Sequence, residues 1–239
     1  MRLPGFRLVH AVYHAIRSPE ARGLAWARLT GPRLVVFQPF GTSRPDRHAD
    51  VFGYVKDQLG SDTGLRLLSF GCSTGDELFS LRALFPSATV RGLDVNPYNI
   101  RKCQDRLSQA GSAPGISVAV ADSTKGEPSE SYDAIFAMAV FRHGLLDFGA
   151  DRCDDYLRFA DFERAVNELA RCLKPGGLLV IRYAHLRFRD TAAFRGFEEI
   201  LPLPPTDPTK PAYGPNHCRL PPGQVGDGVF RKLPAPKAD

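Results

Sequence analysis

Short apolar runs and segments of helical period follow one another through the middle of this chain of 239 residues. Residues 65–70 form an apolar run that leads into a glycine, which is typical of a buried strand. Residues 76–85 then place apolar side chains at helical spacing, and residues 89–94 form a second strand-like run. The pattern therefore predicts a strand, a helix and a second strand, joined by short loops.

The N-terminal part of the chain has a looser helical pattern. Apolar residues recur at loose helical spacing over residues 1–30, with Pro19 and Gly23 as expected interruptions. Residues 49–59 return to a helical period. We therefore expect residues 1–60 to form a small helical cap or lid extension.

The C-terminal part of the chain is rich in proline. Proline removes a backbone donor, so the Pro-rich stretch at about 202–222 is expected to be a loop. Residues 228–233 can supply a closing strand, and residues 197–203 are the candidate for a strand before it. With 43% hydrophobic residues the chain can bury one sizeable core, and we expect residues 61–239 to form the main domain.

The loop between the first predicted strand and its helix carries candidate chemistry. Gly71 and Gly75 allow the backbone to pass close to a ligand and to adopt angles that other residues resist. Open α/β sheets hold nucleotide-like cofactors beyond the carboxyl ends of their strands. Asp94 ends the second predicted strand, and an acid at that place can accept hydrogen bonds from both ribose hydroxyls. These features favour a cofactor with an adenosine end, either a dinucleotide or S-adenosylmethionine.

The spacing within this loop bears on the choice of cofactor. A dinucleotide fingerprint needs Gly-x-Gly-x-x-Gly, whereas this loop reads Gly-x-x-x-Gly. Ser73 stands in place of the middle glycine of the usual methyltransferase loop, and Ser69 stands in place of its leading acid. Residues 71–81 closely resemble the Gly-Cys-Ser-Thr-Gly-Glu-Glu segment of chemotaxis-receptor-type methyltransferases, within the class I S-adenosylmethionine-dependent methyltransferase superfamily.

The resemblance covers roughly residues 64–184. Further segments resemble, in order, the ribose-binding turn, the third strand, the fourth strand and the helix-turn-strand after it: 94–97, 116–123, 132–137 and 173–181. The fold that this resemblance implies is α/β, a three-layer Rossmann-like sandwich. It has a mostly parallel seven-stranded sheet with an antiparallel last strand, plus the small N-terminal helical extension.

The resemblance also implies a site for S-adenosyl-L-methionine. Asp94 would bind the ribose, and Asp122 would face the adenine. Glu77 would lie against the amino group of the cofactor, and Arg47, five residues before Phe52, would meet its carboxylate. The implied cofactor-binding residues are Arg47, Gly71, Cys72, Ser73, Thr74, Gly75, Glu77, Asp94, Val95, Asn96, Asp122, Ser123, Ala137 and Met138.

Methyl transfer from a sulfonium mainly requires alignment of the reactants and exclusion of water. A hydroxyl or amine acceptor also needs a base, and His143 follows the fourth strand, where class I enzymes commonly put groups near the transferred methyl. Arg142 beside it would bind an anionic acceptor. The alternative for Arg142 is a structural salt bridge to a nearby acid: Asp147, Asp151 or Glu163.

Composition favours a cytoplasmic protein without a bound metal or a membrane span. The five cysteines have irregular spacing, which fits neither a metal site nor an even disulfide set, and the acidic stretch 151–155 is expected to be a solvated loop. No apolar stretch approaches the roughly 20 residues of a membrane span, and residues 1–7 make a poor signal peptide. The net charge is +5, but no dense Lys/Arg block indicates a nucleic acid partner.

The sequence therefore predicts an S-adenosylmethionine-dependent methyltransferase that moves a methyl group to an oxygen or nitrogen of a small-molecule or protein acceptor. The family's Cys-Arg-Asn-Val segment has no match after the fourth strand, so receptor glutamates are not the expected acceptor. An NAD-dependent oxidoreductase and a non-catalytic cofactor-binding module are the alternatives. The loop spacing argues against the first, and the complete loop with its two acids argues against the second.

Overall fold

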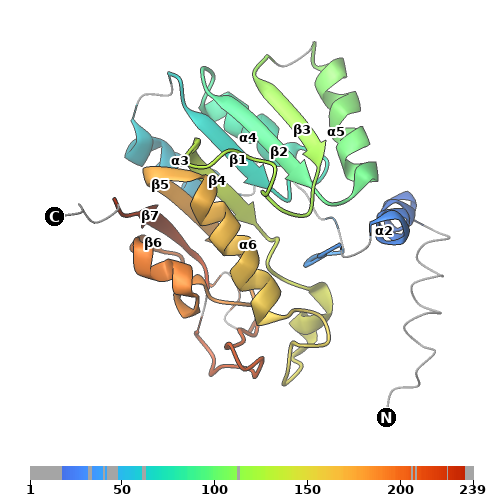
Figure 1. Cartoon of the computed structure of the whole chain (residues 1–239), viewed down its shortest axis with the longest axis vertical. Coiled ribbons are helices and arrows are strands. Elements are labelled where there is room, and N and C mark those ends of the chain that lie inside the picture. Colours follow the sequence, from blue (N-terminus) through green and yellow to red (C-terminus); the bar gives the residue numbers. More distant parts are fainter. Residues whose placement is uncertain are drawn as a thin grey trace.

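The computed structural model describes residues 18–31, 34–39, 41, 48–60, 63–111, 114–205, 207, 209–224 and 226–234. Its centre is a seven-stranded sheet with the order β3-β2-β1-β4-β5-β7-β6 (Figure 1). Strand β7 pairs antiparallel with both β5 and β6, and the other pairs are parallel. The strands are β1 (Arg66–Phe70), β2 (Thr89–Asp94), β3 (Ile116–Val120), β4 (Tyr132–Met138), β5 (Leu173–Arg182), β6 (Phe197–Pro202) and β7 (Gly228–Lys232).

Helices cover both faces of this sheet. Helix α6 crosses in front of the sheet in Figure 1 and packs in one hydrophobic cluster, while α3, α4 and α5 contribute to the cluster on the opposite face. The described helices are α2 (Pro19–Thr30), α3 (Ala49–Leu59), α4 (Asp76–Leu84), α5 (Pro97–Gln109) and α6 (Phe159–Cys172), with short 3-10 helices η1 (Gly144–Phe148), η2 (Phe188–Asp190) and η3 (Ala192–Gly196). The result is a three-layer α/β sandwich.

Successive strand residues point into the two clusters in turn. In β1, Leu67 belongs to the cluster under α3 and α4, and Leu68 belongs to the cluster under α6. In β4, Phe136 belongs to the cluster under α3 and α4, and Ile135 belongs to the cluster under α6. Because side chains alternate along a strand, a strand covered on both faces is apolar at nearly every position. This is why the central strands read as continuous apolar runs in the sequence.

The predicted fold class is confirmed, including the antiparallel closing strand and the strand over residues 197–203. The expected interruption of the first helix at Gly23 is wrong, because α2 runs through it. A Cβ at Gly23 would lie 2.5 Å from Asn96 Oδ1 and 2.7 Å from Tyr98 Cβ, so glycine permits close packing on α5 rather than ending the helix. Pro19 occupies the first turn, where its missing N–H costs nothing.

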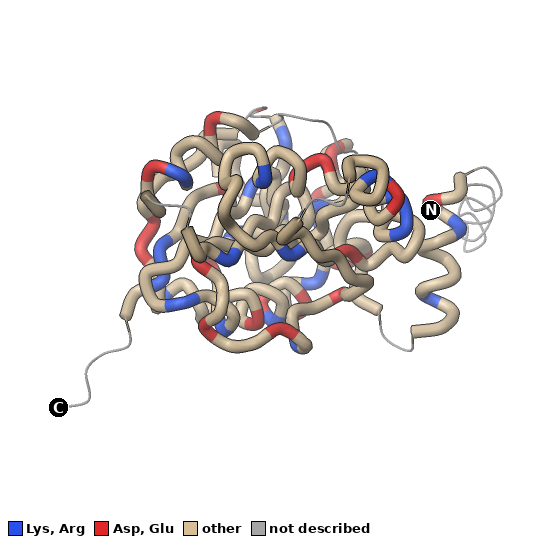
Figure 2. Tube along the Cα trace, turned by 90° about the horizontal axis from the view of Figure 1, so that it is seen from above, with Lys and Arg blue, Asp and Glu red and all other residues tan. Residues whose placement is uncertain are grey.

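The division of the chain at residue 60 stays a prediction. Among the described residues, no helix combines the length and apolar character that a membrane crossing requires. Basic and acidic residues are interspersed along the trace in the view of Figure 2, consistent with a mixed surface rather than a basic stripe on this side.

Candidate functional site

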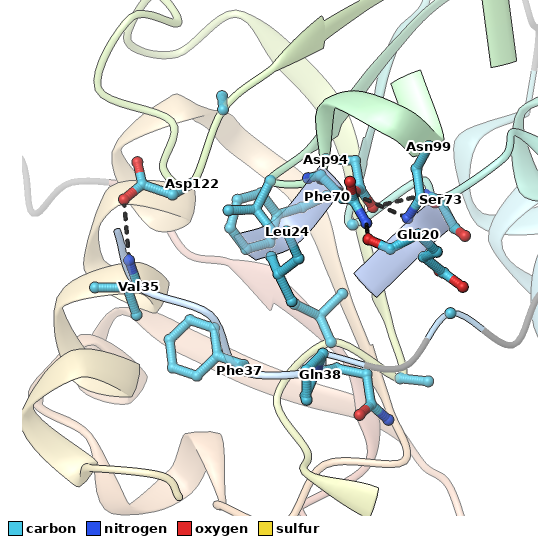
Figure 3. A pocket seen from close by; sticks show the side chains of 18 of the residues that line it. Glu20, Leu24, Val35, Phe37, Gln38, Phe70, Ser73, Asp94, Asn99 and Asp122 are labelled. Atoms are coloured by element: carbon cyan, nitrogen blue, oxygen red, sulfur yellow. Dashed lines mark hydrogen bonds between the residues drawn. The ribbon is translucent and has the colours of Figure 1, made fainter. Parts of the chain in front are cut away.

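A cavity of about 100 Å³ lies at the carboxyl ends of β1, β2, β3 and β4 (Figure 3). Parallel strands bring their carboxyl ends to one edge of the sheet, so loops that are distant in the sequence meet there. Helix α2, Val35, residues 37–39 and Gly41 contribute the rest of the cavity lining. The site therefore combines the sheet edge with the N-terminal part of the described chain.

Asp94 is the buried acid at the end of β2. Its side chain is 8% exposed, and its Oδ2 accepts a hydrogen bond from the Ser73 backbone N–H at 2.9 Å. Its Oδ1 accepts from the Asn96 backbone N–H at 2.8 Å and from Asn99 Nδ2 at 3.4 Å. Burial raises the pKa of this carboxyl, and the two backbone donors partly offset the rise. Oδ2, with a single donor, keeps acceptor capacity for a further one.

The loop after β1 is fixed by backbone contacts that only glycine permits. Gly71 has a φ of +83°, and a Cβ there would lie 2.3 Å from Val140 Cγ2. The N–H groups of Gly71 and Cys72 both donate to the Leu93 carbonyl, at 2.7 and 2.9 Å. The loop is thereby tied to the end of β2, which holds Ser73 against Asp94.

Two further acids lie near this edge. Asp122 lines the cavity, and its Oδ2 accepts from the Val35 backbone N–H at 3.2 Å. Glu77, in the first turn of α4, does not line the cavity and forms no ion pair with a described residue. Burial raises the pKa of Glu77 to about 8, although the Ser69 hydroxyl partly offsets the rise.

These groups fit an adenosine cofactor with an amino acid end. Asn99 Oδ1 is buried at the cavity wall without a hydrogen-bond partner among the described residues, next to the spare acceptor capacity of Asp94. A ribose offers two hydroxyl donors for exactly such acceptors. Glu77 is a partly buried carboxyl without a described cation, and an ammonium is the group that would compensate it.

Arg142 and His143 follow β4 but line neither described cavity. Arg142 forms a salt bridge with Asp147, as the alternative to substrate binding predicted. His185 Nε2 lies 3.0 Å and Lys210 Nζ 3.2 Å from the same carboxyl group. Burial alone would raise the pKa of Asp147, but the His185 hydrogen bond and the Arg142 charge lower it to about 2. This cluster joins the segments after β4 and β5 to the Pro-rich loop.

His143 has a second structural role in addition to its place after β4. Its Nδ1 accepts from the Leu145 backbone N–H at 3.3 Å and so caps η1. Its ring stacks on Tyr156 with centroids 4.6 Å apart, and its backbone N–H donates to His185 Nδ1 at 3.2 Å. With Nδ1 as an acceptor, the neutral ring holds its proton on Nε2.

The structure brings half of the implied cofactor residues to the cavity. Those that line it are Gly71, Ser73, Asp94, Val95, Asn96, Asp122 and Met138. Those that lie nearby without lining it are Cys72, Thr74, Gly75, Glu77, Ser123 and Ala137. Arg47 lies outside the described residues.

The sequence predicted a cap or lid from residues 1–60 but did not show which of its residues line the cavity. Glu20 and Leu24 of α2, with Val35, Phe37 and Gln38, line the cavity and carry no motif that signals it. Asn99 is the exception, because it follows Asn96 by three positions on α5 and therefore shares its helix face.

The acidic stretch after β4 behaves as a solvated loop. Asp154 pairs with Arg152 at 2.9 Å, and both side chains are well exposed. Within the described ranges, no group of three histidine, cysteine or acidic side chains is placed to hold a metal ion. The five cysteines, all of them described, form no disulfide.

The central part of the chain is similar to known methyltransferases. Residues 68–181 match a family model described as a methyltransferase domain. Phthiotriol/phenolphthiotriol dimycocerosates methyltransferase of Mycobacterium leprae is 29% identical over 178 residues, which cover 73% of this chain and 57% of that protein. Malonyl-[acyl-carrier protein] O-methyltransferase of Acetivibrio thermocellus is 26% identical over 133 residues, covering 55% and 40%. The chain thus spans about half the length of these curated relatives.

A solved structure of an amino pentose methyltransferase from Micromonospora echinaspora, bound to S-adenosylmethionine, is also similar. It is 26% identical, has a TM-score of 0.43, and the likeness covers 59% of this chain and 51% of that one.

Proposed function

We propose that this chain is a class I S-adenosylmethionine-dependent methyltransferase, which transfers a methyl group from that cofactor to an oxygen or nitrogen nucleophile; the match of residues 68–181 to a methyltransferase domain model supports the proposal. The observation that carries the proposal is Asp94, which is buried at the end of β2, faces the cavity and is clamped to the glycine loop through Ser73. The bound cofactor supplies an activated methyl on its sulfonium. The chain supplies binding, orientation and exclusion of water.

Each end of the cofactor has a proposed partner at the sheet edge. Asp94 and Asn99 would hold the ribose hydroxyls, and Asp122 would accept from the adenine amino group. Glu77 would compensate the ammonium of the methionine moiety, as the likeness of the loop to the chemotaxis-receptor-type segment suggests. We place Arg47 at the cofactor carboxylate on the same likeness.

The acceptor is a small molecule or a protein that offers a hydroxyl or amine. His143 would take its proton, and Arg142 would orient it. For His143 to act as a base through Nε2, its proton must move to Nδ1, so the contact with the Leu145 N–H must break. Acceptor binding therefore has to reshape the start of η1.

Calorimetry with S-adenosylhomocysteine tests the cofactor site. Asp94→Ala should weaken binding by about a hundredfold or more, because hydrogen bonds to a charged group contribute about 1.5–3 kcal/mol each. Asp227→Ala is the matched control, since Asp227 is also buried and accepts two backbone N–H groups, from Tyr183 and Ala184, but does not line the cavity. Equal affinities of the folded Asp94→Ala variant and the wild type would refute the proposal.

The role of His143 is tested separately. His143→Ala should leave the affinity for S-adenosylhomocysteine within about twofold, because the side chain does not line the cofactor cavity. Methyl transfer to the acceptor, followed by isotope label in a cell extract, should fall about a hundredfold, in the range of general base catalysis. Unchanged transfer would remove His143 from the reaction.

A further inference from the structure

Residues 34–39, here called the strap, cross the outer side of the cofactor cavity (Figure 3). Val35 and Phe37 of the strap line the cavity, and Phe37 packs edge-on against Phe141 with ring centroids 5.2 Å apart. The Val35 backbone N–H donates to Asp122 Oδ2 at 3.2 Å. This hydrogen bond joins residues 87 positions apart in the sequence.

The strap is hydrogen-bonded to Asp122, the acceptor that the adenine of a bound cofactor would need. Strand β3 lies beside β2, with Asp94 in register with Val120, and neighbouring strands are about 4.8 Å apart. A nucleoside whose ribose is held at Asp94 therefore extends its base toward the end of β3, where Asp122 follows. The exocyclic amine of adenine is an N–H donor, and the Val35 N–H already occupies one of the two Asp122 oxygens, Oδ2.

The volume of the cavity also indicates that the strap and a bound adenosine compete for the same space. The cavity measures about 100 Å³, whereas sites for small molecules and cofactors are about 300–1,000 Å³. Leu24 of α2 and Phe37 of the strap take up apolar volume beside Ala121 and Asp122. The strap in its present position thus leaves less room than sites of this kind usually offer.

There is also space into which the strap can move. On its other side lies a second cavity of about 610 Å³, lined by Leu34, Val36 and residues 154–158 among others. Val35 and Phe37 line both cavities, so the strap is the wall between them. Gln38 Oε1 is buried without a hydrogen-bond partner among the described residues, and an unsatisfied buried acceptor disfavours the closed position.

We propose that the strap is an autoinhibitory element: the Val35 N–H takes the place of the adenine amino group on Asp122, and the strap must move toward the second cavity before the cofactor binds. This inference rests on the proposed function. The affinity for cofactor is then reduced by the fraction of molecules whose strap is open. Movement of the strap would also remove the wall between the two cavities.

Hydrogen exchange of the wild-type protein is the first test. With saturating S-adenosylhomocysteine, the Val35 amide should exchange at least about tenfold faster, because its hydrogen bond to Asp122 is lost. Slower or unchanged exchange would overturn the proposal, since the strap would then close over the cofactor rather than compete with it. Failure of the wild type to bind S-adenosylhomocysteine at all would instead count against the proposed function.

Two substitutions at one position provide the second test. Val35→Pro removes the N–H donor, and Val35→Ala keeps it. Val35→Pro should bind S-adenosylhomocysteine about tenfold more tightly than the wild type, whereas Val35→Ala should stay within about twofold. Equal or weaker binding by a folded Val35→Pro variant would contradict the proposal. If this variant fails to fold, the exchange experiment decides the matter on the wild type alone.

Discussion

Replacing Glu77 with glutamine should stabilise the protein above pH 5 and flatten the dependence of its stability on pH. Glu77 lies in the first turn of α4, and burial raises its pKa from 4.5 to about 8. The folded chain therefore keeps a proton that the unfolded chain releases between these two values. Because the folded pKa is the higher one, stability is greatest at low pH and falls as the pH rises from about 4.5 to 8.

The magnitude follows from the size of this difference. At pH 7 the unfolded carboxyl lies 2.5 pH units above its pKa of 4.5, and each unit corresponds to about 1.4 kcal/mol. Retaining the proton at pH 7 thus costs about 3 kcal/mol. Glu77→Gln removes this cost with nearly the same side-chain volume, so its melting temperature at pH 7 should rise by about 6–12 °C, at about 2–4 °C per kcal/mol for a chain of this size.

Urea denaturation at pH 4.5, 7 and 8.5 provides the measurement. The free energies of unfolding of wild type and variant should converge at pH 4.5 and separate at the two higher values. Asp105→Asn, on an exposed part of α5, is the control and should change stability by less than about 0.5 kcal/mol at each pH. A constant difference between wild type and Glu77→Gln across the three pH values would refute the reasoning.

Three other variants test the surroundings of the site. Asp147→Asn should lower the free energy of unfolding by about 2 kcal/mol near neutral pH, since the pKa of Asp147 lies at about 2 rather than 3.8 in the folded chain. This stability is present above about pH 4 and is lost as the pH falls toward 2. The free energies of unfolding of wild type and variant should therefore converge near pH 2 in an acid titration. Gly71→Ala should cost about 2–4 kcal/mol and weaken binding of S-adenosylhomocysteine, because it adds left-handed strain and an overlap with Val140, whereas Gly126→Ala, with open space around it, should be neutral in the same thermal melts. Gly53→Ala within α3 also meets open space and should raise stability by about 0.5–1 kcal/mol, while destabilisation would show that the helix backbone needs glycine there.

The strands were predictable because burial on both faces requires apolar residues at nearly every position, which is visible as a local run in the sequence. Strand β2 has the predicted bounds, and β1 and β4 differ by one residue at one end, since each is a run of apolar residues with few interruptions. The Gly71 loop and Asp94 were also predictable, because a turn after a strand and an acid at a strand end are features of neighbouring residues. Local sequence pattern thus predicts the sheet edge and the position of Asp94, where we propose that the ribose binds.

The sequence predicted a cap or lid over residues 1–60, but it did not show which residues of the strap and of α2 contact the site. The contact between Val35 and Asp122 uses a backbone N–H, which every residue except proline possesses, so no side chain signals it. The predicted helix interruption at Gly23 was wrong for a related reason. Glycine is needed there because Asn96 and Tyr98 pack closely against it, and only the tertiary structure reveals this contact. Contacts of this kind depend on the meeting of distant segments.

Two buried acids at the sheet edge, Asp94 and Asp227, each hold a strained turn in place. Ser73, after β1, and Tyr183, after β5, have φ values of +49° and +57°, which are strained for residues other than glycine. Asp94 accepts from the Ser73 N–H, and Asp227 accepts from the Tyr183 N–H at 2.8 Å, so each strained turn is held by a carboxyl group whose pKa burial raises. Of the two acids, only Asp94 also faces the cavity. The same group that holds the loop in shape therefore presents its remaining acceptor capacity to the cavity, so the proposed ribose site is preorganised by the fold itself.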